Sequence, residues 1–494
     1  MSTIAPADTA TRTVGNFIGG EERPAAAGQA FEKRSPATGE RLSSVARSNA
    51  EDVQAAVAAA KDAQPDWARR PVAERGGLLR AIAQLLERDA EVIAAVVAEE
   101  TGKAPKEARG EVGAAVEQGY FVAGEGRRFY GRTTTSAVPG RQAMTVRQPL
   151  GVAGLIIAAN TPIANVAWKA FPALLCGNGV VLKAPEDTPE TALLFARLTA
   201  EAGIPAGVFN VVQGYGKEAG QPLVEHPAVD VVSFTGSTAV GRMIARVAGE
   251  RLAKVCLELG GKNPLVVCDD ADLESAADAA VLSAYSNAGQ RCAAGSRLLV
   301  FDSVYDHFVS LLVERTKAQR VGPTDDDDFG PVVNAGQLEQ MLSAVERARS
   351  NGARVLAGGK RLLGPDHAGG YYMEPTLLDG VGLDAEIACT ELFGPIATLH
   401  RVSEFAEALE AVNRSPYGLT AAIWTESVHR AQEFIARSSS GVASVNGPTY
   451  GSEPHMPFGG ERASGNGWRE AGTEALDVYS DWKTVYVNHD ASRV

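Results

Sequence analysis

Apolar and polar positions follow two different periods along the chain. Up to about residue 122, apolar side chains recur every three to four positions, as in Val53, Ala56, Val57 and Ala60, which is typical of amphipathic helices. The stretch "SNAE" at residues 48–51 fits a capping box that opens the first of these helices. From residue 151 onward, short apolar runs alternate with helical stretches, which predicts βαβ units around a parallel sheet.

The βα pattern divides into two runs. The first run places strands at residues 151–158, 180–183, 208–212, 229–234 and 254–259. The second extends from "NPLVV" at 263–267 to "GVASVNG" at 441–447, and the turn-rich "LELGGKNP" at 257–264 separates the two. Two segments interrupt the alternation: residues 127–149 are predicted as extended ribbon, and residues 476–490 alternate like a strand.

Composition and charge exclude several classes of protein. The chain has 494 residues, of which 45% are hydrophobic and 22% charged, as in an ordinary globular protein. Its formal net charge of -13 argues against a nucleic-acid partner, which would need a basic footprint. The five cysteines are odd in number and lack C-x-x-C spacing, so we expect neither a disulfide framework nor a zinc ribbon, and no metal site.

The sequence predicts neither a membrane-spanning helix nor a secretory signal. The most apolar region, residues 149–182, is broken by "NTP" and "GNG", whereas a spanning helix needs about 20 apolar residues without such interruptions. The start, "MSTIAPADTATRT", lacks the basic and apolar parts of a secretory signal. We therefore expect a cytoplasmic protein without a membrane partner.

The stretch "FTGSTAVG" at residues 234–241 follows an expected strand and opens an expected helix. Glycines there let the backbone approach a phosphate, and the helix N-terminus supplies free N–H groups. Arg242 and Met243 stand where a nucleotide triphosphatase needs Lys and Ser or Thr, and the spacing is not G-x-G-x-x-G. Taken alone, the loop is equally consistent with a structural turn and with a dinucleotide site.

Several polar residues are placed where chemistry is possible. Lys183 and Glu186 follow a strand and could bond ribose hydroxyls, although a solvated pair explains them as well. Glu258 ends an apolar strand, where a carboxyl group with a raised pKa would suit a general base or serve a structural role. Asn160, in "AANTP", could stabilise an oxyanion or simply form a turn.

Cys292 is the candidate nucleophile. It lies in the glycine-containing, non-periodic "SNAGQRCAAGSR" at residues 286–297, whereas the other four cysteines fit buried apolar positions. Arg291 beside it could favour the thiolate. A nucleophilic thiol, an oxyanion donor, a carboxylate base and a dinucleotide-like loop together indicate covalent thiol catalysis coupled to hydride transfer.

At this point the chain resembles the NAD(P)-dependent aldehyde dehydrogenase superfamily over essentially its whole length. The matching motifs occur in order: "ETGK", "AANTP", "VVLKAPEDTP", "FTGSTAVG", "LELGGKNP", "NAGQRCAAGSR", "ELFGP", "YGLTA" and "PFGGERASGNG". The resemblance implies an α/β fold with two parallel-sheet Rossmann-like domains and a small β-ribbon oligomerisation element. It also implies a homodimer or homotetramer.

The resemblance divides the chain into three parts. Residues 1–126 and 150–259 are expected to form the NAD-binding domain, residues 260–470 the catalytic domain, and residues 127–149 and 471–494 the oligomerisation element. Cys292 resembles the nucleophile, Glu258 the general base, and the Asn160 amide with the Cys292 backbone N–H the oxyanion hole. The implied cofactor contacts are Lys183, Glu186, Gly216, Phe234, Gly236, Ser237, Leu259, Glu391 and Phe393.

The implied reaction oxidises an aldehyde to its acid through a thiohemiacetal and a thioester that water hydrolyses. CoA-acylating semialdehyde dehydrogenases resemble this chain but typically lack the glutamate at position 258, and a thiol esterase without NAD is a further alternative. Glu186 is expected to disfavour the 2′-phosphate of NADP, so NAD is the expected cofactor, with NADP possible.

One region departs from the family's usual pattern. Ala159, Thr161 and Ser286 replace rings that many members carry, which predicts a wider or more polar substrate tunnel. We therefore expect an aldehyde bulkier or more polar than short alkyl aldehydes. The other expected wall residues are Asn165, Trp168, Tyr450 and His455; alternatively, other side chains refill the space.

Overall fold

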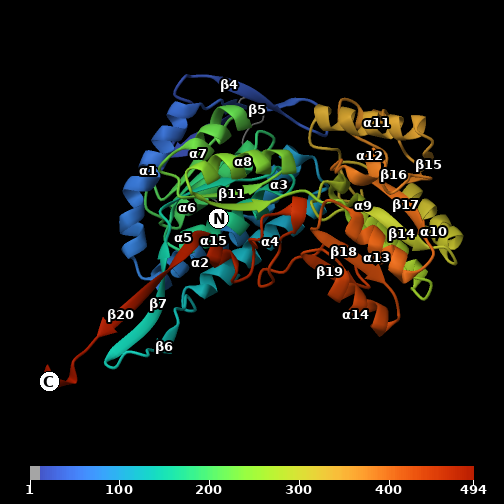
Figure 1. Ribbon diagram of the computed structural model, residues 1–494. Coiled ribbons are helices and arrows are strands. Elements are labelled where there is room, and N and C mark those ends of the chain that lie inside the picture. The colour runs from blue at the N-terminus through green and yellow to red at the C-terminus, as the bar shows by residue number, and fades with distance from the viewer. Residues whose placement is uncertain (1–11, 494) are drawn as a thin grey trace.

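The computed structural model describes residues 12–493, so the first residues of the expected NAD-binding domain and most of the stretch read for an export signal lie outside it. Figure 1 shows two lobes side by side, with a ribbon projecting from the first. Each lobe is built on a seven-stranded sheet, and two three-stranded sheets complete the strands. This confirms the predicted α/β fold with two largely parallel sheets and a small antiparallel one.

The first sheet has the strand order β12-β11-β8-β9-β10-β2-β3. The five strands from β12 to β10 are parallel, and β2 and β3 continue the sheet in antiparallel pairing. Their bounds are β12 (Lys254–Glu258), β11 (Val231–Thr235), β8 (Val152–Ile156), β9 (Gly179–Lys183), β10 (Phe209–Val212), β2 (Asn16–Ile18) and β3 (Glu21–Arg23). The five strands that the sequence predicts for this lobe are thus present, each within a few residues of its expected bounds.

Helices cover both faces of the first sheet because the strands are apolar on both sides. Val152 and Val181 pack on one face in a cluster with α1 (Ala50–Arg69), α7 (Gln221–Glu225) and α8 (Thr238–Glu250). Ala153 and Leu182 point to the other face. Most helical residues of that second cluster come from α2 (Val72–Arg88), α3 (Ala90–Thr101), α4 (Pro105–Glu125), α5 (Pro162–Leu175) and α6 (Pro189–Glu201), with further ones from α1 and the helix at Ala475–Tyr479.

The first helix begins one residue later than the sequence predicts. Asn49 is its N-cap, accepting from the Glu51 N–H at 2.8 Å, and Asp52 accepts from the Asn49 N–H at 3.1 Å. Ser48 is not free to cap, because its hydroxyl donates to Asn16 at 2.8 Å. The capping box expected at residues 48–51 is therefore wrong by one position.

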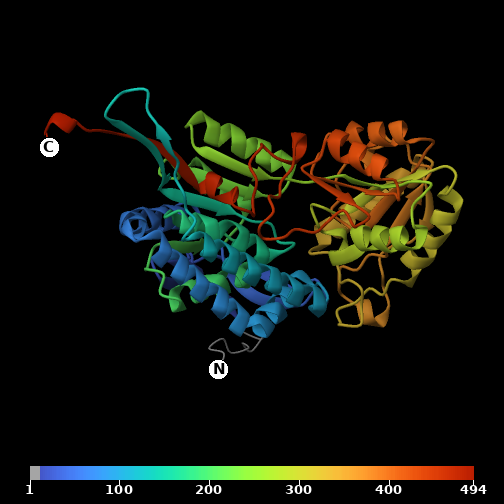
Figure 2. The same cartoon turned by 90° about the horizontal axis from the view of Figure 1, so that it is seen from below.

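The second sheet has the order β15-β16-β17-β14-β13-β18-β19, parallel except for β15 against β16. Its strands are β15 (Arg354–Ala357), β16 (Thr376–Asp379), β17 (Ile396–Val402), β14 (Gly295–Phe301), β13 (Asn263–Val267), β18 (Thr420–Trp424) and β19 (Val442–Val445). Helices flank it on both faces (Figure 2). They are α9 (Leu273–Tyr285), α10 (Tyr305–Ala318), α11 (Ala335–Ser350), α12 (Glu386–Cys389), α13 (Phe405–Arg414) and α14 (Val428–Arg437).

The projecting ribbon joins two segments that lie far apart in the sequence. It consists of β6 (Thr133–Thr135), β7 (Arg141–Pro149) and β20 (Ser480–Asn488), in the antiparallel order β20-β7-β6. The expectation of a strand from residue 476 onward is wrong at its start, since α15 (Ala475–Tyr479) is helical. The other small sheet contains β1 (Thr13–Val14), β5 (Arg41–Ala46) and β4 (Ala30–Arg34).

The division into domains remains a prediction, although the two large sheets fall on either side of the expected boundary. Glu258 ends the last strand of the first sheet, and Asn263 begins the first strand of the second. The chain later returns to the first sheet, because the Leu259 N–H donates to the Ser464 carbonyl at 3.0 Å. No helix within residues 12–493 is both long and apolar enough to cross a membrane.

Candidate active site

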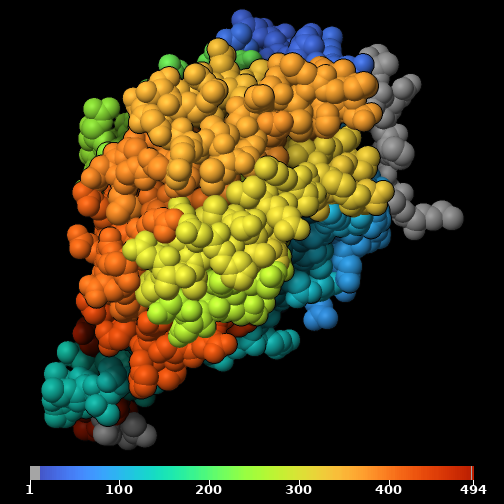
Figure 3. Space-filling model, turned by 90° about the vertical axis from the view of Figure 1, so that its right-hand side faces the viewer, coloured from blue at the N-terminus to red at the C-terminus, as the bar shows by residue number. Residues whose placement is uncertain are grey.

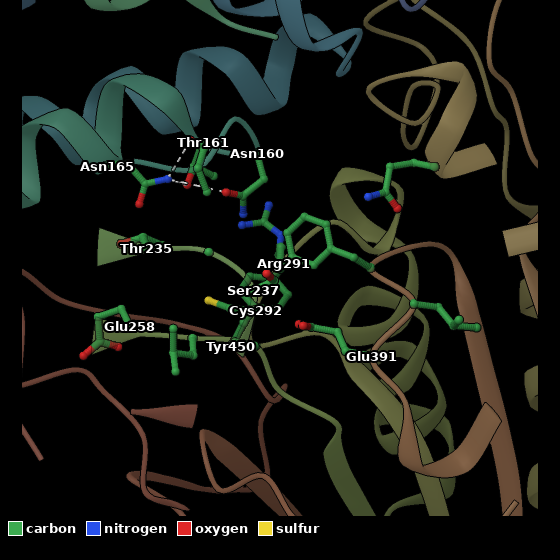
Figure 4. A pocket seen from close by; sticks show the side chains of 18 of the residues that line it. Asn160, Thr161, Asn165, Thr235, Ser237, Glu258, Arg291, Cys292, Glu391 and Tyr450 are labelled. Atoms are coloured by element: carbon green, nitrogen blue, oxygen red, sulfur yellow. Dashed lines mark hydrogen bonds between the residues drawn. The ribbon is translucent and has the colours of Figure 1, made fainter. Parts of the chain in front are cut away.

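A cavity of about 1170 Å³ lies where the two large sheets face each other. Asn160, Glu258 and Cys292 all line it, and Figure 4 shows the three side chains in one view. The structure therefore brings together the three residues that the sequence predicts for catalysis.

The first sheet contributes the carboxyl ends of its strands. β8, β11 and β12 are parallel neighbours, so the segments after them emerge at one edge. Asn160 follows β8, Gly236 and Ser237 follow β11, and Glu258 is the last residue of β12. This topology explains why residues far apart in the sequence reach one cavity.

The second sheet contributes the amino ends of its strands. Cys292 lies just before β14, which starts at Gly295, and Glu391 and Phe393 lie just before β17, which starts at Ile396. All three residues line the cavity. The nucleophile candidate therefore faces the carboxyl ends of the first sheet from the opposite lobe.

The segment before Cys292 has an unusual backbone. Asn287, Ala288 and Gly289 have φ values of 53°, 53° and 66°, in the left-handed region that favours glycine. A Cβ at Gly289 would collide with the Gly394 carbonyl oxygen. Three consecutive left-handed residues end α9 abruptly and turn the chain toward the cavity.

Hydrogen bonds hold this turn against the oxyanion candidate. The Asn287 N–H donates to Glu107 at 2.6 Å, and the Asn287 side chain donates to the Asn160 carbonyl at 3.1 Å. Lys103 donates to the same carbonyl at 2.7 Å and to Glu111 at 2.5 Å. The loop carrying Cys292 and the segment carrying Asn160 are therefore fixed relative to each other.

The Asn160 amide is suitably placed to stabilise a negative oxygen. One of its N–H groups donates to the Gln290 carbonyl at 2.9 Å, and its oxygen is 3.4 Å from the Asn165 amide nitrogen. Within residues 12–493, neither the second amide N–H nor the Cys292 backbone N–H has a protein acceptor. Two donors are thus available beside the thiol, as an oxyanion hole requires.

Burial dominates the acidity of the Cys292 thiol. It raises the pKa of Cys292 to about 12, and the charges of Glu391 and Glu258 act in the same direction. The Ala293 N–H and Arg291 oppose this effect and lower the pKa. The expectation that Arg291 favours the thiolate is correct in direction, but burial and the two carboxylates outweigh it.

Glu258 lies at the buried end of β12 with 4% of its surface exposed. Burial raises the pKa of Glu258 well above its ordinary 4.5, and the Glu470 carboxylate raises it further. Neither carboxylate oxygen of Glu258 has a hydrogen-bond partner in the described part of the chain. A buried carboxyl group with raised pKa and no protein partner is suited to accept a proton from water.

A buried polar cluster of Lys169, Ser233 and Glu470 lies near Glu258 and was not predicted from the sequence. Lys169 is fully buried and donates to Glu470 at 2.5 Å and to Ser233 at 2.8 Å. Ser233 also donates to Glu470 at 2.6 Å. The signal was a lysine within the apolar helix "PIANVAWKAFPALL", which cannot be buried without a partner.

Most of the expected cofactor residues lie around the first sheet, whereas Glu391 and Phe393 precede β17 of the second. Lys183 ends β9 and donates to Glu186 at 2.8 Å, and Ser237 caps α8 at the end of β11. Gly236, Ser237, Leu259, Glu391 and Phe393 line the cavity, whereas Lys183, Glu186, Gly216 and Phe234 do not. A Cβ at Gly236 would collide with the Phe234 ring, so glycine keeps this turn close to the helix N-terminus.

Glu391 is the best placed of these residues to bind a polar group from the cavity. It accepts from the Gly261 N–H at 3.0 Å, and burial raises its pKa to about 7. The open N-terminus of α8, the Lys183–Glu186 pair and Glu391 provide phosphate-binding N–H groups and hydroxyl-binding side chains. These residues fit a dinucleotide.

The expected substrate residues divide into two groups. Thr161, Asn165, Trp168 and Tyr450 line the cavity, whereas Ala159, Ser286 and His455 do not. His455 is exposed and lies 3.6 Å from Glu453. Four further lining residues were not predicted from the sequence: Lys103 from the loop between α3 and α4, Glu107 and Glu111 from α4, and Phe458 from the segment after β19. In the described residues, no group of three or more His, Cys, Asp or Glu side chains is placed to hold a metal ion.

Comparison with known proteins agrees with this geometry. A family model described as the aldehyde dehydrogenase family matches residues 23–485. An alpha-ketoglutaric semialdehyde dehydrogenase of Bacillus subtilis is 39% identical over 482 residues, covering 97% of this chain and 99% of that protein.

Solved structures are similar over the same length. A betaine aldehyde dehydrogenase of Staphylococcus aureus in complex with NAD+ matches with a TM-score of 0.94 and 32% identity, covering 96% of this chain and 95% of that one. A 3,6-anhydro-L-galactose dehydrogenase in complex with NADP matches with a TM-score of 0.94 and 38% identity, covering 97% and 100%. The chain therefore belongs to the aldehyde dehydrogenase family and is an NAD(P)-dependent aldehyde dehydrogenase.

Proposed function

We propose that this enzyme oxidises a polar aldehyde to its carboxylic acid by covalent catalysis at Cys292, with water as the final acceptor of the acyl group. The observation that carries the proposal is that Cys292, Asn160 and Glu258 line one cavity. Residues from both sheets are needed to complete this set.

The three residues have distinct roles in the proposed reaction. The Cys292 thiolate attacks the aldehyde carbon, and the oxygen becomes an anion that the Asn160 amide and the Cys292 N–H stabilise. NAD+, when bound, would supply the acceptor for the hydride of this carbon, which would leave a thioester on Cys292. Glu258 then takes a proton from water as the water attacks the thioester, which releases the acid and restores the thiolate.

The residues that would hold the cofactor favour NAD+ over NADP+. The N-terminus of α8 would bind the pyrophosphate, Lys183 and Glu186 the adenosine ribose, and Glu391 the nicotinamide ribose. Glu186 is negatively charged and half-exposed, so it would repel a 2′-phosphate. Gly216, Phe234, Leu259 and Phe393 would contribute apolar and backbone contacts.

A polar substrate is supported by the lining of the cavity. Thr161, Asn165 and Arg291 provide polar groups, while Trp168 and Tyr450 provide aromatic walls. The Bacillus subtilis relative is named for a semialdehyde, which is a polar aldehyde. Acyl transfer to CoA is the less favoured alternative, because a carboxyl group already occupies the cavity as a base for hydrolysis.

Two further observations support the proposed oligomeric state and location. The ribbon exposes Trp482, Tyr486 and Val487, which favours a homodimer or homotetramer. All five cysteines are unpaired, as in proteins of a reducing compartment such as the cytoplasm.

One set of assays tests the proposal. NADH formation is followed with acetaldehyde, propanal and succinic semialdehyde, with NAD+ and with NADP+, for the wild type and for Cys292→Ala. We expect activity with NAD+, higher efficiency for the polar aldehyde, and a loss of at least about 1000-fold in Cys292→Ala. Cys389→Ala, which removes a cysteine outside the cavity, is the matched control. Full activity of Cys292→Ala, or turnover only with CoA, would contradict the proposal.

A further inference from the structure

Arg291 precedes the candidate nucleophile and points into the same cavity (Figure 4). Its guanidinium lies over the Tyr450 ring, 4.6 Å from the ring centroid, and its Nε donates to the Ser286 hydroxyl at 3.1 Å. Two contacts therefore fix the plane and the direction of this cation.

The outer end of the guanidinium has no hydrogen-bond partner in the described part of the chain. The Glu107 carboxylate is nearest, but it lies 3.8 Å from Nη2, beyond hydrogen-bond distance. Glu107 instead accepts from the Asn287 N–H, and burial raises the pKa of Glu107. The Nη1 and Nη2 donors thus need water or a ligand.

The other cations of the cavity are already engaged. Lys103 bonds Glu111 and the Asn160 carbonyl, and Arg347 forms two hydrogen bonds with Glu386, at 3.1 and 2.7 Å. Among the described residues that line the cavity, Arg291 is the cation without a hydrogen-bonded carboxylate. Its charge is therefore the least neutralised of the three, and a negative group of a substrate would bind best there.

We propose that Arg291 binds the carboxylate of the substrate, which is a short aldehyde acid with the two groups at opposite ends. A planar guanidinium matches a carboxylate through two parallel hydrogen bonds, which a point charge cannot do. Arg291 and Cys292 are consecutive, so their Cα atoms lie about 3.8 Å apart. The carboxylate and the aldehyde of the substrate would therefore be bound by side chains from neighbouring positions of one loop. This inference rests on the proposed function and narrows its substrate class.

Ser286 gains a different role from the one that the sequence suggested. It does not line the cavity, but its hydroxyl holds the Arg291 Nε. Ser286 is therefore a positioning residue for the Arg291 guanidinium. An aromatic side chain at position 286 would offer no oxygen to accept from the Arg291 Nε.

The test compares a charged and a neutral aldehyde. The ratio of kcat/KM for succinic semialdehyde to that for butanal is measured for wild type, Arg291→Gln and Arg291→Lys. We expect the ratio to fall about 10- to 100-fold in Arg291→Gln, as for the loss of a hydrogen-bonded charge, and to recover partly in Arg291→Lys. Arg69→Gln is the matched control, an exposed arginine paired with Asp66 on α1. An unchanged ratio in Arg291→Gln would overturn the proposal that Arg291 binds the substrate carboxylate.

Ser286 is tested by the same pair of substrates. Ser286→Ala is expected to raise KM for succinic semialdehyde a few-fold with little change in kcat or in KM for butanal. Ser286→Thr keeps the hydroxyl and is expected to restore the wild-type KM. A uniform loss for both aldehydes would assign Ser286 a structural role only.

A wild-type measurement covers the case in which Arg291→Gln does not fold. Glutarate is expected to inhibit the oxidation of succinic semialdehyde competitively, with an inhibition constant at least about tenfold lower than that of the neutral glutaramide. Equal inhibition constants would overturn the proposal that Arg291 binds the substrate carboxylate. Absence of NAD+ reduction by wild type with every aldehyde would instead contradict the proposed function. Equal kcat/KM for succinic semialdehyde and butanal would contradict the role of Arg291 but leave the proposed function standing.

Discussion

The surroundings of Cys292 favour its neutral thiol over the thiolate. Burial and two neighbouring carboxylates stabilise its neutral thiol, while Arg291 and one backbone N–H oppose them. Because the reactive form is the thiolate, attack requires an additional stabilising influence within the assembled complex. A cationic nicotinamide ring is of the right charge to provide it.

Alkylation of the thiol tests this state. The pKa of Cys292 is about 12, so its thiolate fraction is small at pH 8 and rises about tenfold per pH unit up to pH 10. The rate of iodoacetamide labelling at Cys292 in cofactor-free protein should follow this slope. Labelling is measured by mass spectrometry, with Cys389 as the internal control. A plateau below pH 9 would show that the thiol is already ionised.

Glu258→Gln separates the two halves of the reaction. The thioester still forms, but the base for hydrolysis is gone, and a general base contributes about 100- to 10,000-fold. Stopped-flow absorbance should therefore show a burst of one NADH per active site followed by a strongly slowed steady state. Glu470→Gln, in the buried cluster behind Glu258, keeps the base and should show no such burst. A Glu258→Gln enzyme with unchanged steady-state rate would contradict the assigned role.

At the scale of elements, the turn between α9 and β14 places the candidate nucleophile Cys292. Gly289 has a positive φ and no room for a side chain, since a Cβ would collide with the Gly394 carbonyl. Gly352 also has a positive φ, but no atom lies within 4 Å of the position that a Cβ would take there, so it bears only the conformational cost.

Gly289→Ala and Gly352→Ala form a matched pair. We expect Gly352→Ala to cost about 1 kcal/mol of unfolding free energy without changing activity. Gly289→Ala should cost more than this and lower kcat at least about tenfold, because the loop must move to relieve the collision. Thermal unfolding and steady-state kinetics measure both effects. Equal behaviour of the two variants would show that the close approach to Gly394 is unimportant.

Much of the fold was predictable because its elements are strongly periodic. The buried strands of the first sheet and the face formed by Val53, Ala56, Val57 and Ala60 follow from apolar spacing. The start of α15 did not, because Leu476 and Val478 fit a strand as well as a helix. Only packing against the first lobe selects the helix there.

Only part of the candidate site was predictable from the sequence. Asn160, Glu258 and Cys292 stand beside turns and strand ends, where the sequence itself marks them. Lys169 and Glu470 lie far apart in the sequence and meet only in the folded chain. The link between Ser286 and Arg291 likewise depends on the left-handed turn between them, which no periodicity reports.

At the scale of the whole molecule, the ribbon is the most exposed element. It stands away from the lobes in Figure 1, and its atoms, in teal, protrude beyond the lobe that faces the viewer in Figure 3. Tyr486 is 60% exposed and Trp482 is 45% exposed. Exposed aromatic side chains on an open sheet edge favour association with another copy.

Charge substitution on the ribbon should dissociate the oligomer. We expect the double variant Trp482→Asp, Tyr486→Asp to elute at a smaller mass than wild type in size-exclusion chromatography with light scattering. Leu363→Asp introduces the same charge at another exposed apolar position, which is 76% exposed and lies outside the ribbon, and should leave the mass unchanged. A wild-type protein that is monomeric at micromolar concentration would contradict the expectation.

The unpartnered carboxyl group of Glu258 also affects the stability of the molecule. Its folded-state pKa is raised by burial, so the folded protein holds this proton more tightly than the unfolded chain does. Stability is therefore lost as pH rises above the ordinary value near 4.5, and the full penalty applies above the folded-state pKa. Gln at this position should unfold at a higher temperature than wild type at pH 8 and at the same temperature at pH 4. Above this pKa the protein is thus expected to be less stable than its Glu258→Gln variant, and selection for stability alone would not retain a carboxyl group at this position.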